Sequence, residues 1–514
     1  MNGIMTGCTT ARRRFGMWSR LQRNIGRLLC LAWTAWAFGT PTLAASADAD
    51  AVIQRAQLAL GGANVKTITF TGAGSGGLFG QAYEPNLVWP KLMIPLMTRV
   101  LDFEAGGFRE DAIRSRAEVR GGGGNPPFGE GDASSVGFMR ERFSWTTIGT
   151  FVGPAAGSYE TRVHDLWTSS PQGAILAAKR FNAVAEAVSK GGQAYSTLSF
   201  SIPKVMEAVV WVDMNGLVTE IAAKIPNPVM GDMEILTLFE DYREISGIKF
   251  PLRIRQTQGG GEFFDIAVRD VRLDLPSDTE VPPAIQTPAA RPSLIVEKIA
   301  DGVWFLRGGT HNSVAIEMAD HILLVEAPLS DGFATQLFSR ANGLVPGKTV
   351  RSVVVTHHHF DHTGGLRYAA SQDATLFVSA IAKPYYERVL ANPNRIVPDR
   401  LAQSGKVPRI VGVGARHVFS DAVRTVEVHE IPDSLHARGF VMAYLPKEKI
   451  LIEGDPFHIR PQDNMLRPLP VATEINLIEN IERLRLNVER ILPLHGRASS
   501  MEELNARSGK AGHN

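Results

Sequence analysis

The apolar runs of residues 48–273 are short and separated by turn-forming residues, a pattern typical of β-strands. Runs at 209–212 and 217–221 flank the dipeptide Asn215-Gly216, which strongly favours a tight β-hairpin. Further runs of the same kind follow at residues 235–239, 254–257 and 263–271. The pattern predicts a mainly β domain over residues 48–273, built on an antiparallel sheet.

From residue 293 to residue 505 the pattern changes, and short apolar strands alternate with stretches of helical periodicity. The predicted strands include residues 303–306, 313–317, 322–326, 353–356 and 424–431. The predicted helices include residues 332–341, 366–371 and 475–486. Such alternation predicts a layered α/β domain.

Residues 274–292 separate the two patterns and contain five prolines with almost no apolar periodicity. Prolines stiffen such a segment and interrupt regular structure, so we expect a linker between two domains. A short disordered tail is expected at residues 506–514.

The composition agrees with more than one globular domain. The chain has 514 residues, of which 44% are hydrophobic and 21% are charged, enough for two cores. The formal net charge is +2, but residues 1–47 contain six arginines and no acid, which leaves −4 for the remainder. An acidic remainder has no basic surface of the kind that nucleic-acid binding requires, which disfavours that class of partner.

Residues 1–47 have the three parts of a secretory signal: an arginine-rich start, an apolar stretch at 28–38 and a small-residue exit at 45–47. The apolar stretch is too short to span a bilayer comfortably, so we expect a mature chain without a membrane span. The sequence therefore predicts a periplasmic or secreted protein. Arg12-Arg13-Arg14 partly matches a twin-arginine signal, and the choice between that route and the general secretory route stays open.

Both cysteines, Cys8 and Cys30, lie within this signal. A mature chain without thiols has no disulfide framework, no cysteine nucleophile and no cysteine metal ligand.

The densest cluster of reactive side chains follows the valine run at 353–355. His357, His358, His359, Asp361 and His362 come directly after it, and paired glycines then lead into a predicted helix. Loops between a buried strand and a helix commonly carry function in α/β proteins, because the scaffold holds them while their side chains stay accessible. Imidazole and carboxylate are ligands that zinc prefers, and iron or manganese less exclusively. The cluster predicts a metal site.

A catalytic metal centre needs ligands from more than one segment, and three later side chains each end an apolar strand. These are His436, Asp455 and His495. Together with His357, His359, Asp361 and His362 of the first cluster, they are candidate metal ligands. His358 alternates away from them and is expected to pack or to support a ligand, whereas His311 and His458 are candidates for substrate contact.

The pattern His357-x-His359-x-Asp361-His362, followed at intervals of 74, 19 and 40 residues by the three later ligands, resembles the signature of the metallo-β-lactamase superfamily. The resemblance covers residues 294–500 and implies an αββα sandwich with two divalent metal ions, zinc in the first place and iron or manganese as alternatives. It assigns His357, His359 and His436 to one metal, Asp361, His362 and His495 to the other, and Asp455 to the bridge between them.

The implied activity is hydrolysis. A hydroxide shared by two metals would attack an ester, thioester, lactone or amide carbonyl of a small molecule, with Asp361 as a catalytic residue that orients the hydroxide or accepts its proton. An aspartate at the bridging position and the absence of a cysteine ligand are more similar to the glyoxalase II, lactonase and phosphodiesterase branches than to the zinc-thiolate β-lactamases.

Two other functions stay open. The first is a mononuclear iron enzyme similar to the sulfur dioxygenases that share this fold. The second is a carrier of hydrophobic or acyl ligands with an accessory metal domain, because residues 241–251 resemble a turn of the lipoprotein-carrier half-barrel.

Overall fold

The computed structural model describes residues 46–86, 89–118, 120–122, 132–287, 294–459 and 471–509. Nearly all of the predicted signal (1–47), the last part of the predicted linker (274–292) and the end of the predicted tail (506–514) lie outside the described residues. In the described part of the chain, no helix combines the length and the hydrophobicity needed to cross a membrane.

A single antiparallel sheet of 14 strands forms the framework of the first domain. In their order across the sheet, the strands are β1 (Ser46–Ala47), β8 (Val184–Lys190), β9 (Gln193–Ile202), β10 (Met206–Asp213), β11 (Val218–Asn227), β12 (Gly231–Ile245), β13 (Ile248–Gln258), β14 (Gly261–Leu273), β2 (Thr67–Gly77), β3 (Lys91–Asp102), β4 (Gly107–Arg116), β5 (Ala133–Arg140), β6 (Phe143–Ile148) and β7 (Phe151–Pro154). The expected hairpin is β10–β11, and its turn is stabilised by the Asp213 carboxylate, which accepts from the backbone N–H of Asn215.

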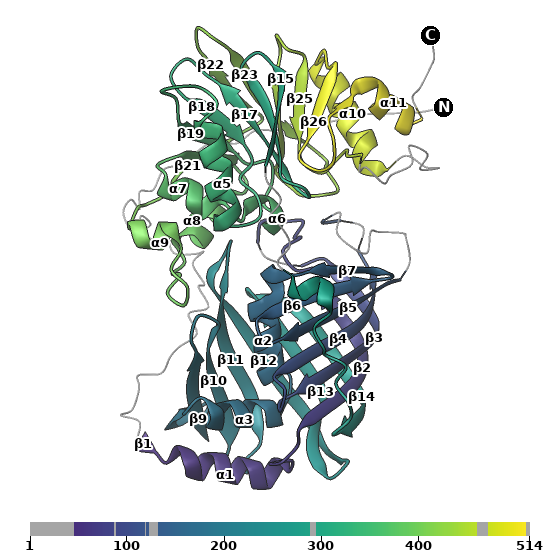
Figure 1. Cartoon of the computed structure of the whole chain (residues 1–514), viewed down its shortest axis with the longest axis vertical. Coiled ribbons are helices and arrows are strands. Elements are labelled where there is room, and N and C mark those ends of the chain that lie inside the picture. The colour runs from purple at the N-terminus through teal and green to yellow at the C-terminus, as the bar shows by residue number, and fades with distance from the viewer. Residues whose placement is uncertain are drawn as a thin grey trace, which may run out of the picture. The chain divides into compact units, whose positions relative to one another are not determined.

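Three helices pack on one face of this sheet: α1 (Ala49–Leu60), α2 (Tyr159–Thr168), which follows a 3₁₀ turn η1 (Ala156–Ser158), and α3 (Pro171–Arg180). Helix α2 contacts β11 and also β4, although five strands separate these two in the sheet. The sheet must therefore curve around α2, as Figure 1 shows. The apolar side chains of the three helices fill the concave side and join those of the sheet in one core. These helices were not among the elements expected from the sequence.

Strand β2 has the sequence TITFTGAGSGG, and its glycines allow an unusually close approach to the neighbouring strand β14. A Cβ atom on Gly74 would overlap the backbone carbonyl oxygen of Asp265. Backbone atoms in the middle of a sheet cannot move aside as the end of a flexible side chain can.

We expect Gly74→Ala to lower the free energy of unfolding by about 1–3 kcal/mol, the usual cost of overpacking a tight site. Urea unfolding of the full chain measures it. Gly157→Ala is the matched control, because its Cβ would meet no atom within 4 Å. Equal unfolding midpoints for the two variants would contradict this account of β2.

The second domain contains two sheets packed face to face. The first has seven strands, in order β15 (Ile295–Ala300), β16 (Val303–Arg307), β17 (Asn312–Glu317), β18 (Ile322–Val325), β19 (Val350–Val354), β20 (Thr375–Ser379) and β21 (Arg409–Val413). The second has six, in order β22 (Arg416–Ser420), β23 (Thr425–Ile431), β24 (Phe440–Leu445), β25 (Ile450–Glu453), β26 (Arg490–Pro493) and β27 (Ser499–Ser500). Strands β18 to β21 run parallel, as do β25 and β26.

The helices cover the outer faces of the two sheets, so that the layers follow the order α, β, β, α (Figure 1). The helices of this domain are α5 (Asp331–Asn342), α6 (Phe360–Thr363), α7 (Leu366–Ser371), α8 (Lys383–Ala391), α9 (Arg400–Ser404), α10 (Ala472–Leu484) and α11 (Met501–Arg507). Of these, α6 and α9 are short.

Strand β18 explains why the sandwich needs both coverings. All four of its residues are buried, and they alternate between the core under the helices (Ile322, Leu324) and the core between the sheets (Leu323, Val325). A strand that is apolar on both faces is stable only when both faces are covered. The predicted αββα sandwich preceded by a mainly antiparallel β domain is confirmed.

The first half of the segment between the domains packs against the β domain, unlike the linker expected from the sequence. The Thr279 side chain is buried, its hydroxyl oxygen accepts from Arg140, and a short helix α4 (Pro283–Gln286) follows. The predicted tail also begins too early, because α11 includes Arg507, whose buried guanidinium forms an ion pair with Glu474. Neither packing contact follows from local composition.

Candidate metal centre

Four loops meet at one edge of the sandwich and bring the seven predicted ligands together. Residues 357–362 follow β19, and His436 lies in the connection from β23 to β24. Asp455 and His495 each lie two residues past the end of a strand, β25 and β26 respectively. Because β25 and β26 are parallel neighbours, their carboxyl ends place these two side chains side by side.

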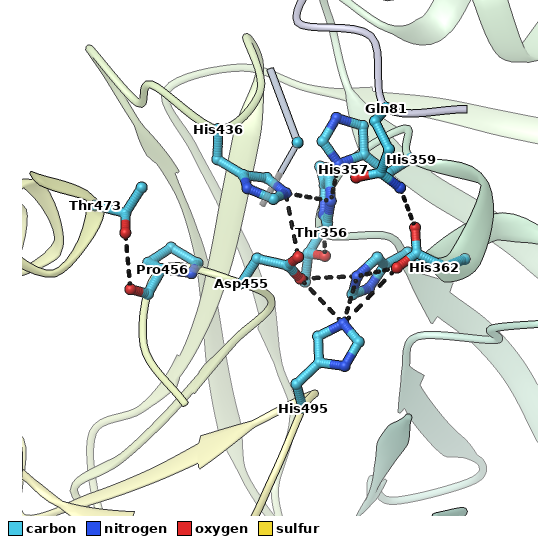
Figure 2. Close-up of polar contacts among 12 residues, drawn as sticks. Gln81, Thr356, His357, His359, His362, His436, Asp455, Pro456, Thr473 and His495 are labelled. Carbon is cyan, nitrogen blue, oxygen red and sulfur yellow. Dashed lines mark hydrogen bonds and ion pairs between the residues drawn. The ribbon is translucent and has the colours of Figure 1, made fainter. Parts of the chain in front are cut away.

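The first group consists of three fully buried imidazoles from two loops, His357, His359 and His436 (Figure 2). His357 Nε2 lies 2.9 Å from His359 Nδ1 and 3.1 Å from His436 Nε2. Tetrahedral zinc with nitrogen ligands at 2.0–2.1 Å separates neighbouring ligand atoms by about 3.3 Å. The spacing of these nitrogens therefore fits a single metal ion.

The second group contains Asp361, His362 and His495. His495 Nε2 lies 3.1 Å from His362 Nε2 and 3.8 Å from Asp361 Oδ2. A fourth side chain, His311 from the β16–β17 turn, joins them with its Nε2 atom 3.2 Å from Asp361 Oδ2. The sequence had suggested only substrate contact for His311.

Asp455 lies between the two groups and directs one carboxylate oxygen to each (Figure 2). Its Oδ2 is 3.2 Å from His436 Nε2, and its Oδ1 is 2.7 Å from His362 Nε2. Oδ1 is nevertheless buried without a hydrogen-bond partner among the described residues. An orphaned carboxylate oxygen surrounded by imidazole nitrogens fits a bound cation.

Protonation equilibria of His357, His359 and Asp455 also suit a cation. Burial, together with the neighbouring imidazoles, holds the pKa of His357 and of His359 well below the usual value, so both rings are neutral and carry free lone pairs. Burial alone would raise the pKa of Asp455, but the adjacent imidazoles outweigh it and keep the pKa well below its usual range. Neutral imidazoles and ionised carboxylates are the forms that bind metals.

A buried carboxylate outside the predicted set orients the ligands. Glu326 follows β18 directly and accepts from the Thr356 hydroxyl at 2.6 Å, while His362 Nδ1 donates to it at 3.2 Å. This contact leaves His362 Nε2 facing Asp455. Glu326 is also an acid at the end of an apolar strand, so the rule that identified the ligands could have found it.

We expect Glu326→Gln to weaken metal binding by about 10- to 100-fold, because the neutral amide is a poorer acceptor for the His362 N–H. Competition with a chromophoric chelator measures the affinity. The exposed Glu479 on α10 provides the control substitution, Glu479→Gln. Unchanged affinity in Glu326→Gln would show that the orientation of His362 does not depend on this carboxylate.

The two groups differ in their access to solvent. The first group is buried, whereas the side chains of Asp361 and His495 keep 32% and 19% of their exposure. A substrate must therefore approach from the side of Asp361 and His495. His458 borders this side, with its ring centroid 6.0 Å from that of His495. His358 points away, is buried and donates to the backbone carbonyl of Ala82.

Residues 306–495 match the family model of the metallo-beta-lactamase superfamily. A stretch of 178 residues is 27% identical to 2,4-dinitroanisole O-demethylase subunit alpha of Nocardioides sp. (strain JS1661). This match covers 34% of the present chain and 50% of that protein, so the chain spans about half the length of its curated relative.

Part of the chain is similar to solved structures that include a metallo-beta-lactamase from Pontibacter korlensis, which is 18% identical with a TM-score of 0.32 over 41% of this chain and 95% of that chain. The metallo-beta-lactamase FIM-1 from Pseudomonas aeruginosa in its mono-zinc form is also 18% identical, with a TM-score of 0.32 over 43% of this chain and 96% of that chain.

Proposed function

Because residues 306–495 form a metallo-β-lactamase superfamily domain, we propose that the chain is an exported hydrolase that uses two divalent metal ions to cleave a small-molecule ester, thioester, lactone or amide. The proposal rests on the position of Asp455, whose two carboxylate oxygens each contact a histidine of a different ligand group. Zinc is the metal that suits nitrogen and oxygen donors without a thiolate best, with iron and manganese as alternatives.

The described residues would hold one ion with His357, His359 and His436, and the other with Asp361, His362 and His495. Two ions held there would lower the pKa of water enough to provide a nucleophile near neutral pH and would polarise the carbonyl group whose carbon is attacked. No serine or cysteine nucleophile is required for such a reaction.

Asp361 has a second role in this proposal, because it is the most exposed of the seven ligands. Burial would raise its pKa, but the neighbouring imidazoles of His362 and His311 lower the pKa below its usual range, so the carboxylate stays ionised. An ionised Asp361 can accept a hydrogen bond from the attacking water and orient it towards the electrophile.

His311 supports Asp361 as a neutral side chain. Burial lowers the pKa of His311 to about 4, against the opposing effect of Asp361. Its Nδ1 atom lies 3.0 Å from the Thr310 hydroxyl, and its Nε2 atom faces Asp361 Oδ2. The ring can thus donate to Asp361 without adding a positive charge at the mouth of the site.

The test is a hydrolysis screen of the zinc-loaded full chain. The panel contains p-nitrophenyl esters, a lactone, a β-lactam, a glutathione thioester and a phosphodiester, with 2,4-dinitroanisole added because of the relative's name. We expect one class to be hydrolysed by the parent protein and by Asp320→Ala, an exposed control, but not by Asp361→Ala.

Equal rates for Asp361→Ala and the parent on every substrate would contradict the proposed hydrolase. Metal analysis that finds one iron and no zinc in the natively loaded protein, together with oxygen consumption, would favour the dioxygenase instead. Co-purified lipid with no hydrolysis after metal loading would favour the carrier. Detection of the chain in the periplasm or medium of its host tests export.

A further inference from the structure

A loop of the β domain reaches the metal centre of the second domain. This loop, residues 78–84 after β2, is called the capping loop here. Backbone hydrogen bonds run from Phe360 N–H to Gly80 O at 3.1 Å and from Arg438 N–H to Tyr83 O at 2.9 Å. Phe360 lies between ligands of the metal-binding motif, and Arg438 lies two residues after His436, so the capping loop contacts both ligand loops of the first group.

Gln81 is the residue of the capping loop that contacts a ligand through its side chain. Its Nε2 atom donates to Asp361 Oδ1 at 2.8 Å. The other oxygen, Oδ2, faces His311, His362 and His495. Gln81 therefore binds the carboxylate oxygen that points away from the second group. This contact fixes the plane of the carboxylate, and with it the direction in which Oδ2 faces the second group.

The carbonyl of Ala82 makes the corresponding contact with the first group. His359 Nε2 donates to Ala82 O at 2.9 Å, which leaves His359 Nδ1 as the lone pair beside His357. A hydrogen bond from the remote ring nitrogen sets the tautomer and orientation of a metal-binding histidine. The β domain thus contacts one ligand in each group through adjacent residues.

Aromatic packing holds the capping loop in place. The Phe360 ring inserts beside Phe79 and Trp89 of the β domain, with edge-on contacts at centroid distances of 5.2 and 5.6 Å. Gly80 makes this close approach possible, because its φ is +77° and an added Cβ would lie 2.9 Å from Phe360 Cγ. The aromatic residue inside the metal-binding motif is therefore part of the junction with the other domain.

We propose that the capping loop of the β domain is a working part of the metal centre, with Gln81 as a positioning residue for Asp361 and the Ala82 carbonyl as a positioning group for His359. The inference rests on the proposed function in one respect, that two metal ions bind to the seven ligands. It gives the β domain a role in the reaction, because without the capping loop Asp361 and His359 would each lose a group that orients them.

The experiment measures the affinity of the full chain for cobalt(II) without substrate, with the protein and a chromophoric chelator competing for the ion. The absorption spectrum of the protein-bound cobalt is also recorded. Gln81→Met keeps the side-chain length and removes the N–H donor, and Gln81→Ala removes both. The control is Gln54→Ala at an exposed position of α1. We expect both Gln81 variants to bind one of two ions about 10- to 100-fold more weakly, with an altered spectrum, and the control to match the parent.

A parent-like affinity and spectrum in Gln81→Met would overturn the proposal, because a residue that only fills space would tolerate methionine. Gly80→Val provides a second variant, which displaces the capping loop from Phe360; we expect weaker binding of both ions. Thermal unfolding of each metal-free variant separates loss of the fold from loss of positioning. A parent protein that binds fewer than two ions would contradict the proposed function itself. If the parent binds two ions and the Gln81 variants bind them with the same affinity, only the role of the capping loop is contradicted.

Discussion

Asp455→Ala is expected to reduce hydrolysis by about 10³-fold or more and to lower the bound metal from two ions to one or none. The carboxylate lies close to both groups, with one oxygen 2.7 Å from His362 Nε2 and the other 3.2 Å from His436 Nε2. Its removal takes a ligand from each site and a buried negative charge from between them. Loss of one ion removes several kcal/mol of transition-state stabilisation, and about 4 kcal/mol corresponds to about 10³-fold in rate.

Metal content by elemental analysis and kcat/KM on the best substrate of the screen test this expectation together. Asp320→Ala removes an exposed carboxylate from the turn before β18, at the opposite ends of the parallel strands, and is expected to retain both metals and full activity. Two tightly bound ions in Asp455→Ala would show that the bridge assigned to this residue does not exist.

Arg99→Met is expected to destabilise the β domain by about 3–5 kcal/mol. Arg99 lies on β3, is 1% exposed and faces the core beneath α2. Its guanidinium donates to Glu110 at 2.8 Å and to Ser169 at 2.7 Å, and it lies 3.3 Å from Asp165. Methionine fills a similar volume but removes this cation from beside Asp165 and Glu110, so that only Arg114 remains paired with Glu110.

Guanidinium unfolding followed by tryptophan fluorescence measures this effect, because Trp89, Trp145, Trp167 and Trp211 all lie in the β domain. Arg269→Met on β14 is the control, since Arg269 is exposed. A loss no larger than that of the control would mean that the charge cluster contributes little to stability.

The same cluster predicts a pH dependence. Burial alone would raise the pKa of Glu110, but the charges and hydrogen bonds of Arg99 and Arg114 outweigh it and lower the pKa from 4.5 to about 2. A carboxyl group with a lowered folded-state pKa stabilises the fold fully above its unfolded pKa and loses this contribution as the pH falls towards the folded value. The shift corresponds to roughly 3 kcal/mol.

We therefore expect the difference in unfolding free energy between the parent and Arg99→Met to be constant above pH 5 and to shrink between pH 4.5 and about 2. Unfolding curves at pH 3 and pH 6 decide the matter. A difference that is unchanged between the two would indicate that Arg99 acts through packing and through its contact with Ser169, and not through Glu110.

Local patterns in the second domain predicted its layered α/β architecture and several of its elements. The apolar run before His357 forms β19, and helices were expected close to the bounds of α5, α7 and α10. Each of these elements has a core face that is set by its own periodicity, with few competing patterns nearby.

The β domain was less predictable, because its interior is shared between distant segments. Helices α2 and α3 are buried over most of their length, so they lack the two-sided pattern that marks a surface helix, and their partners are strands many residues away. In the same way, the burial of Thr279 and Arg507 depends on side chains that meet them only in the folded protein.

The linear order of His, Asp and strand residues was sufficient to predict which side chains meet at this edge, because each of them follows an apolar strand. Local sequence could not reveal which ligand each orienting group contacts. Glu326 reaches His362 across two neighbouring strands, and Gln81 reaches Asp361 across 280 residues and from a different domain. Such contacts depend on how loops approach one another after the sheets have formed, so only the tertiary structure connects the β domain to the metal centre.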